Sequence, residues 1–100
     1  MTKTALITGA GIGIGRATAI AFAAQGDHVV VTDVLQDEGQ SVVQEIKDAG
    51  GSAEFQPLDV TDTARADALV ADVEKRCNGI DVIVANAGIA HRIPLAELTD

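Results

Sequence analysis

The sequence is poor in aromatic residues and in cysteine. Its 100 residues include no tryptophan, no tyrosine, two phenylalanines and one cysteine, Cys77. Hydrophobic residues still make up 47% of the chain, mainly alanine, valine and isoleucine, so one small domain with a finely grained aliphatic core is expected. A single cysteine excludes an internal disulfide, and its place on an apolar helical stripe predicts a core thiol rather than a nucleophile.

Basic residues are also scarce. The chain has 7 lysines and arginines against 15 aspartates and glutamates, with a formal net charge of −8. Nucleic acids and anionic membranes are bound by clusters of basic residues, and these seven are scattered, so neither partner is expected. No apolar run approaches the roughly 20 residues of a membrane helix, and the N-terminus has no signal-peptide pattern. We therefore expect a cytoplasmic protein.

Short apolar runs alternate with stretches of helical length along the whole chain. The apolar runs cover residues 3–8, 28–33, 53–58 and 80–86, and the helical stretches cover 14–25, 36–49 and 61–77. The second and fourth runs are nearly continuous valine and isoleucine, which predicts strands buried on both faces. Helices between consecutive strands predict parallel pairing through right-handed crossovers. The sequence thus predicts an α/β fold with a doubly wound parallel sheet and no internal domain boundary.

Four residues mark the ends of the expected strands. Gly9, Asp33, Asp59 and Asn86 each lie at or just after the last residue of an apolar run. The carboxyl ends of parallel strands lie along one edge of a sheet, and open α/β sheets bind their ligands at that edge. We therefore expect these four residues to lie along the same edge, beside a ligand.

The segment "ITGAGIGIGRATA", residues 7–19, places glycines at every second position from Gly9 to Gly15. It lies where the first strand ends and a helix begins, so unpaired N–H groups and the positive end of the helix dipole meet there. Missing Cβ atoms allow a pyrophosphate to approach the backbone and the helix to pack closely on the strand. A simple tight turn is the alternative, but it would not require four glycines.

The glycine spacing is T-G-x-x-x-G-x-G rather than G-x-G-x-x-G. With Asp33 after the second strand, Asp59–Val60 after the third and N-A-G at 86–88 after the fourth, the chain resembles the short-chain dehydrogenase/reductase family over nearly its whole length. The resemblance implies a Rossmann sheet with strand order 3-2-1-4 and an NAD-dependent oxidoreductase, commonly a homo-oligomer, acting on an alcohol or carbonyl substrate. The cofactor-binding residues that it implies are Gly9, Gly13, Ile14, Gly15, Asp33, Asp59, Val60, Asn86, Ala87 and Gly88.

Asp33 and Asp59 each have a functional and a structural interpretation. The Asp33 carboxylate can accept hydrogen bonds from the adenosine ribose hydroxyls and would repel a 2′-phosphate, and residues 12 and 34 are not basic, so NAD is expected rather than NADP. The alternative is a solvated carboxylate that caps the next helix. The resemblance implies that Asp59 bonds the adenine amino group beside the Val60 N–H. The alternative is that Asp59 or Thr61 simply caps the third helix.

The residues for catalysis are missing. In the resembled family a tyrosine transfers the proton, a nearby lysine lowers its pKa and a serine orients the substrate carbonyl. This chain has no tyrosine, no Y-x-x-x-K pattern and only two serines, Ser41 and Ser52. We therefore assign no catalytic residue and no metal ligand, and expect residues 1–100 to be the N-terminal, cofactor-binding part of a single Rossmann domain in a longer enzyme, inactive alone.

Two other functions stay open at this point. One is a non-catalytic nucleotide-binding half-domain. The other is an S-adenosylmethionine methyltransferase, because Gly9, Gly11 and Gly13 also form G-x-G-x-G. Methyltransferases usually carry an acidic residue shortly before these glycines, whereas this chain has Leu6–Ile7–Thr8.

Overall fold

The computed structural model of the chain describes residues 2–86. Its elements are β1 (Thr4–Thr8), α1 (Gly13–Ala24), β2 (His28–Asp33), α2 (Gln36–Asp48), β3 (Ser52–Pro57), α3 (Thr63–Arg76) and β4 (Val82–Ala85). Every helix and strand expected from the sequence is present, with bounds that differ by at most two residues. Among the described residues, no helix has both the length and the apolar character needed to cross a bilayer.

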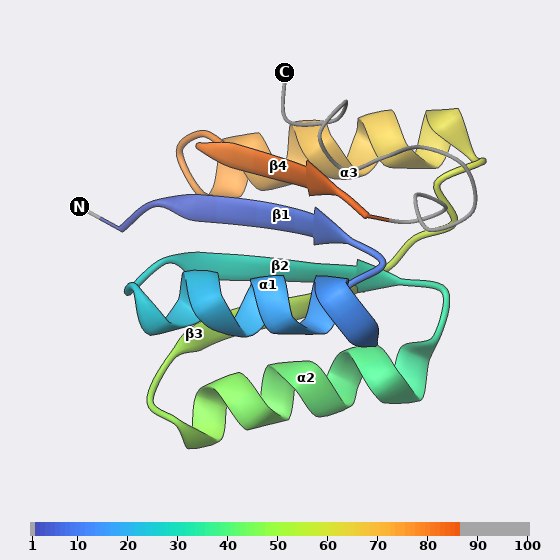
Figure 1. The fold of residues 1–100 in the computed structure, drawn as a ribbon. Coiled ribbons are helices and arrows are strands. Elements are labelled where there is room, and N and C mark those ends of the chain that lie inside the picture. The colour runs from blue at the N-terminus through green and yellow to red at the C-terminus, as the bar shows by residue number, and fades with distance from the viewer. Residues whose placement is uncertain (1, 87–100) are drawn as a thin grey trace.

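The four strands form one parallel sheet in the order β3-β2-β1-β4. Helices α1 and α2 lie on one face of the sheet and α3 lies on the other (Figure 1). The doubly wound fold and the strand order 3-2-1-4 are therefore confirmed. Because all strands run the same way, the ends of the strands that precede Gly9, Asp59 and Asn86 meet at one edge, as expected, together with Asp33.

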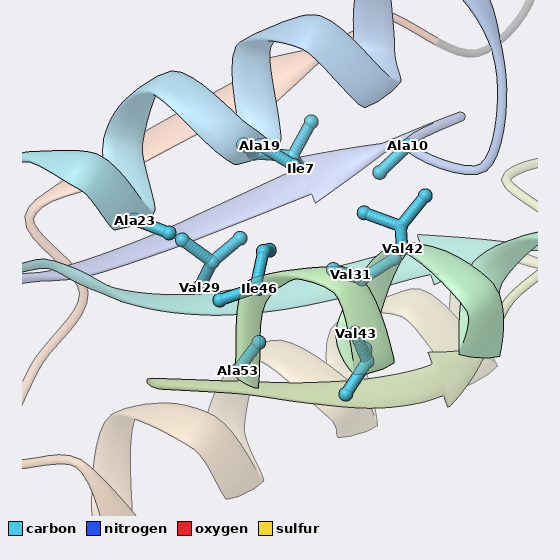
Figure 2. Packing of buried hydrophobic residues seen from close by; sticks show 10 residues of the cluster. All are labelled: Ile7, Ala10, Ala19, Ala23, Val29, Val31, Val42, Val43, Ile46 and Ala53. Atoms are coloured by element: carbon cyan, nitrogen blue, oxygen red, sulfur yellow. The ribbon is translucent and has the colours of Figure 1, made fainter. Parts of the chain in front are cut away.

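The core consists of two aliphatic layers, one on each face of the sheet. In β2, Val29 and Val31 face α1 and α2, while Val30 faces α3, and all three are fully buried. Figure 2 shows Val29 and Val31 among small side chains from both helices, including Ala19 and Ala23 of α1. Alanines at these positions let the middle and the end of α1 lie close to the sheet.

The prediction that the fourth strand is buried on both faces is wrong. Within the described part of the chain, strand β4 pairs only with β1, and its residues alternate between half-buried and exposed. Ile83 lies opposite Leu6, on the face that α3 covers, yet 56% of its surface is exposed. Among residues 2–86, α3 is the only helix on that face, and its Leu69 and Val73 pack with Leu6 of β1 and Val30 of β2. A valine- and isoleucine-rich run at a sheet edge therefore keeps one side in solvent.

Candidate nucleotide-binding site

The glycine loop joins β1 to α1 at the carboxyl edge, and its glycines do two different things. Gly9 and Gly13 have φ values of 62° and 59°, in the left-handed region where only glycine is free of strain. Gly11 and Gly15 lie outside that region. A Cβ on Gly15 would overlap the carbonyl oxygen of Gly9. The first pair thus sets the course of the backbone, and the second pair allows close approach.

Among residues 2–86, no side chain caps the amino end of α1. Its N-cap residue, Ile12, makes no side-chain cap, and the first turn contains no acidic residue. In α3, by contrast, the Asp62 carboxylate accepts a hydrogen bond of 3.1 Å from the N–H of Arg65. A Cβ added at Gly13 would meet no other described atom within 4 Å, so none of residues 2–86 fills the space beside the loop there. An anion such as a pyrophosphate fits this place, because it would supply the missing acceptors.

Asp33 ends β2 with a buried carboxylate that is only 7% exposed. Its Oδ2 accepts a hydrogen bond of 2.9 Å from the Gly11 N–H, and its Oδ1 accepts one of 3.0 Å from the Leu35 N–H. The alternative of a solvated cap is therefore wrong, and the N-cap residue of α2 is Leu35, which makes no side-chain cap. An ionised carboxylate can accept about four hydrogen bonds. Two acceptor positions are left for ligand hydroxyls.

Asp59 follows β3 on the same edge and is exposed. Its Oδ1 accepts hydrogen bonds from the backbone N–H of Thr61 at 2.9 Å and from the Thr61 hydroxyl at 2.7 Å. These bonds lower the pKa of the Asp59 carboxyl. The prediction that Asp59 or Thr61 caps the third helix is wrong, since Asp62 does so. Asp59 instead closes a tight turn that presents Val60 beside it.

Exposed large hydrophobic side chains gather along this edge. Of the six in the described part of the chain, five follow strand ends here, and the sixth is Ile83 in β4. The five are Ile12 (56% exposed), Ile14 (61%), Val34 (62%), Leu35 (38%) and Val60 (39%). Single exposed hydrophobic residues are ordinary, but a concentration along one edge indicates a surface that contacts a ligand or partner. Here it flanks the uncapped helix and the Asp33 carboxylate.

Asn86 follows β4 at the same edge. Its buried Nδ2 has no hydrogen-bond partner among residues 2–86. A buried amide without a partner costs about 1–3 kcal/mol, so Asn86 is suited to bind a further group. The other two residues of the predicted N-A-G segment, Ala87 and Gly88, lie outside the described residues.

The amino edge of the sheet holds a polar cluster that the sequence analysis missed. The Glu54 carboxylate binds Arg76 Nη2 at 2.8 Å, His28 Nε2 at 2.9 Å and Gln56 Nε2 at 3.0 Å. Burial alone would raise the pKa of Glu54, but these hydrogen bonds outweigh it and lower the pKa to about 2. The half-buried Cys77 lies nearby, with donor atoms of His28, Glu54 and Cys77 all within 4.8 Å. Because Arg76 already neutralises Glu54, the cluster acts as an ion-pair network joining β2, β3 and α3.

The fold and the carboxyl edge together define a Rossmann-type nucleotide-binding domain. An open parallel sheet, a glycine loop that feeds an uncapped helix and a carboxylate at the end of β2 are its characteristic parts. A family model for short chain dehydrogenases matches residues 3–100. The chain therefore belongs to the short-chain dehydrogenase/reductase family.

Named relatives in this family cover the chain almost completely. This chain is 40% identical over 102 residues to the L-2,3-butanediol dehydrogenase of Corynebacterium glutamicum, and the matched region covers 100% of this chain and 40% of that protein. It is 40% identical over 97 residues to the sorbitol dehydrogenase of Cereibacter sphaeroides, covering 97% of this chain and 37% of the relative. The chain thus spans about two fifths of the length of these relatives.

Solved structures give the same result. A hydroxysteroid dehydrogenase from Escherichia coli superposes with a TM-score of 0.82 at 38% identity, over 97% of this chain and 43% of that one. A metagenomic short-chain oxidoreductase in complex with NADP superposes with a TM-score of 0.78 at 32% identity, over 81% of this chain and 37% of that one. The methyltransferase alternative is left without support.

Proposed function

We propose that residues 1–100 bind NAD and form the N-terminal, cofactor-binding part of a single Rossmann domain in an oxidoreductase. The complete enzyme would move a hydride between nicotinamide and an alcohol or carbonyl carbon. The observation that carries the proposal is the uncapped amino end of α1 beside the buried Asp33 carboxylate. Family membership supplies the reaction class, and NAD supplies the hydride chemistry when it is bound.

Each part of the carboxyl edge has a proposed share in holding the dinucleotide. Backbone N–H groups of the loop and first turn would bind the pyrophosphate, and the acceptor positions left on Asp33 would bind the ribose hydroxyls. Asp59 and the Val60 N–H would bind the adenine. The segment proposed to hold the pyrophosphate includes Gly9, Gly13, Ile14 and Gly15. The N-A-G segment, Asn86, Ala87 and Gly88, would leave room for the cofactor.

The preference for NAD over NADP rests on charge. A 2′-phosphate carries close to two negative charges at neutral pH and would lie against the ionised Asp33. A basic residue could offset this repulsion, but Ile12 and Val34 occupy the neighbouring positions. Arg16 is close in sequence, and Glu45 already binds its Nη2 through both carboxylate oxygens, at 2.5 and 2.8 Å. The family also contains NADP-bound members, so this preference has to be measured.

Calorimetric titration of the purified protein with NAD⁺, NADP⁺ and S-adenosylmethionine tests the proposal. We expect NAD⁺ to bind at least tenfold more tightly than NADP⁺, and S-adenosylmethionine not to bind. Comparable affinities for NAD⁺ and NADP⁺ would refute the preference. Absence of binding by both would refute the nucleotide site.

A second candidate function is a nucleotide-binding half-domain without catalysis, favoured by the lack of any tyrosine in the chain. Both candidates predict that the 100-residue protein binds NAD⁺. They are distinguished by alcohol turnover, measured as NADH absorbance, with a longer protein that contains this chain. Turnover that depends on Asp33 supports the enzyme, and its absence in a folded, NAD-binding protein supports the half-domain.

A further inference from the structure

Gly11 lies between the glycine loop and the Asp33 carboxylate. Its φ is not in the left-handed region, so backbone conformation does not explain why this residue is a glycine. Space does explain it. An ideal Cβ on Gly11 would lie 2.9 Å from Oδ2 of Asp33, 3.1 Å from Cβ of Glu38 and 3.2 Å from N of Gly39. The first of these distances is shorter than real Cβ atoms tolerate.

The three neighbours of that Cβ differ in how readily they can move. Glu38 and Gly39 belong to the first turn of α2, and the Gly39 N–H already donates a hydrogen bond of 2.9 Å to the Leu35 carbonyl. The Asp33 carboxylate is the end of a side chain and can rotate. A side chain at position 11 would therefore displace the carboxylate before it moved the helix, and it would break the 2.9 Å hydrogen bond from the Gly11 N–H.

We propose that Gly11 is a positioning residue for nucleotide selection. Its bare Cα lets its N–H hold one oxygen of Asp33, while the Leu35 N–H holds the other. This fixes the carboxylate with its two remaining acceptor positions toward a ligand that offers two hydroxyl donors, a ribose diol. A 2′-phosphate offers no such donor and adds negative charge. The inference rests on the proposed function, in which Asp33 receives the ribose.

The first test compares two glycine variants by calorimetry with NAD⁺ and NADP⁺. Gly11→Ala should weaken NAD⁺ binding about tenfold or more and NADP⁺ binding much less, because only the ribose diol depends on the carboxylate. Gly13→Ala is the matched control. Gly13 lies in the part of the loop proposed to face the pyrophosphate, which both nucleotides share, so this variant should weaken both alike. An unchanged affinity ratio in Gly11→Ala would overturn the inference.

A double-mutant cycle with Asp33→Ala sharpens the test. In the Asp33→Ala background, Gly11→Ala should weaken NAD⁺ binding by less than about twofold, because the atom that the new Cβ would strike is gone. Losses that simply add would show that Gly11 acts independently of Asp33. If Gly11→Ala does not fold, the double variant decides the outcome. Restored folding supports the inference, and continued failure shows that the backbone of α2 is the obstruction.

Amide hydrogen exchange at Gly11, followed by NMR without nucleotide, separates this inference from the proposed function. The Gly11 amide should be protected in the wild type and lose protection in Asp33→Ala, but keep it in Asp59→Ala. If the wild type binds neither nucleotide, the proposed function fails. The inference then fails with it as a statement about selection, while the exchange data still show whether Gly11 holds the carboxylate. Unchanged protection in Asp33→Ala would overturn that contact directly.

Discussion

Replacing Gly15 by alanine sets two well-known effects against each other. Gly15 lies inside the first turn of α1, where alanine is favoured over glycine by up to about 1 kcal/mol. The new Cβ, however, would overlap the carbonyl oxygen of Gly9 and lie 2.8 Å from its carbonyl carbon and 3.0 Å from Cα of Ala10. All three atoms are backbone, so none can rotate away. Overpacking of this kind costs about 1–3 kcal/mol or more, and we expect a net loss of about 1–2 kcal/mol.

Thermal and urea unfolding followed by far-UV circular dichroism measure this loss. The chain has no tryptophan or tyrosine, so the helical signal is a better probe than fluorescence. A loss of about 1–2 kcal/mol corresponds to a fall in Tm of about 4–16 °C for a domain of this size. The urea midpoint should fall with the slope m unchanged, because the surface exposed on unfolding stays the same.

The sign of the change decides between the two effects. Ser41→Ala, on the exposed side of α2, reports helix propensity without a clash and should be neutral or slightly stabilising. If Gly15→Ala is as stable as the wild type or more stable, the loop does not press against α1. Gly15 would then not be needed for close packing of α1 against the loop.

Three further predictions concern stability and association. Folding lowers the pKa of Glu54 from 4.5 to about 2. The ionised carboxylate therefore contributes about 3 kcal/mol to the free energy of unfolding before solvent screening, and about 1–2 kcal/mol once screening is included; this contribution is present above pH 4.5 and lost as the pH falls toward 2. Glu54→Gln should flatten this part of the pH–stability curve, and a curve identical to that of the wild type would contradict the prediction. Asp62→Ala removes the cap of α3 and should cost about 1 kcal/mol in urea unfolding, whereas Thr61→Ala should cost less, and equal losses would contradict the assignment. Among the described residues β4 pairs only with β1 and leaves Ile83 exposed, so the protein should self-associate as its concentration rises. Ile83→Lys should reduce this self-association in sedimentation velocity. An unchanged sedimentation profile would show that the β4 edge is not the contact between molecules.

The sequence predicted the fold almost completely, because local and global signals agree in it. The continuous Val29–Val31 run predicts a strand buried on both faces, as β2 is. Helices end at glycines such as Gly26 and Gly50, whose φ values of 96° and 88° few other residues adopt. Alternation of strands and helices then leaves little choice of topology. The strand-end residues of the candidate site follow directly from that topology.

The sequence predicted less well wherever distant residues decide the outcome. Asp59, Thr61 and Asp62 lie within four positions, and all three residue types are common at helix N-caps. In the structure, the Asp59 carboxylate is used in a turn with Thr61, and the Asp62 carboxylate caps α3. The burial of β4 depends on what lies beside it. The amino-edge network was invisible because Glu54 lies 26 residues from His28 and 22 from Arg76, and the pairing of β2 with β3 is what brings the first two together.

The two edges of the sheet differ in how their polar groups are satisfied. At the amino edge, both oxygens of Glu54 bind partners from β2, β3 and α3, so this edge contributes to stability and offers little to a ligand. At the carboxyl edge, the amino end of α1 has no cap, the Asn86 amide has no partner among the described residues, and large hydrophobic side chains are exposed. On the proposed function, a bound dinucleotide would contact these groups and stabilise the folded protein. Added NAD⁺ should therefore raise the free energy of unfolding by mass action, by about 2.7 kcal/mol at a hundredfold excess over Kd, and Tm should rise with it. Changes to the amino-edge network should lower Tm equally with and without the ligand.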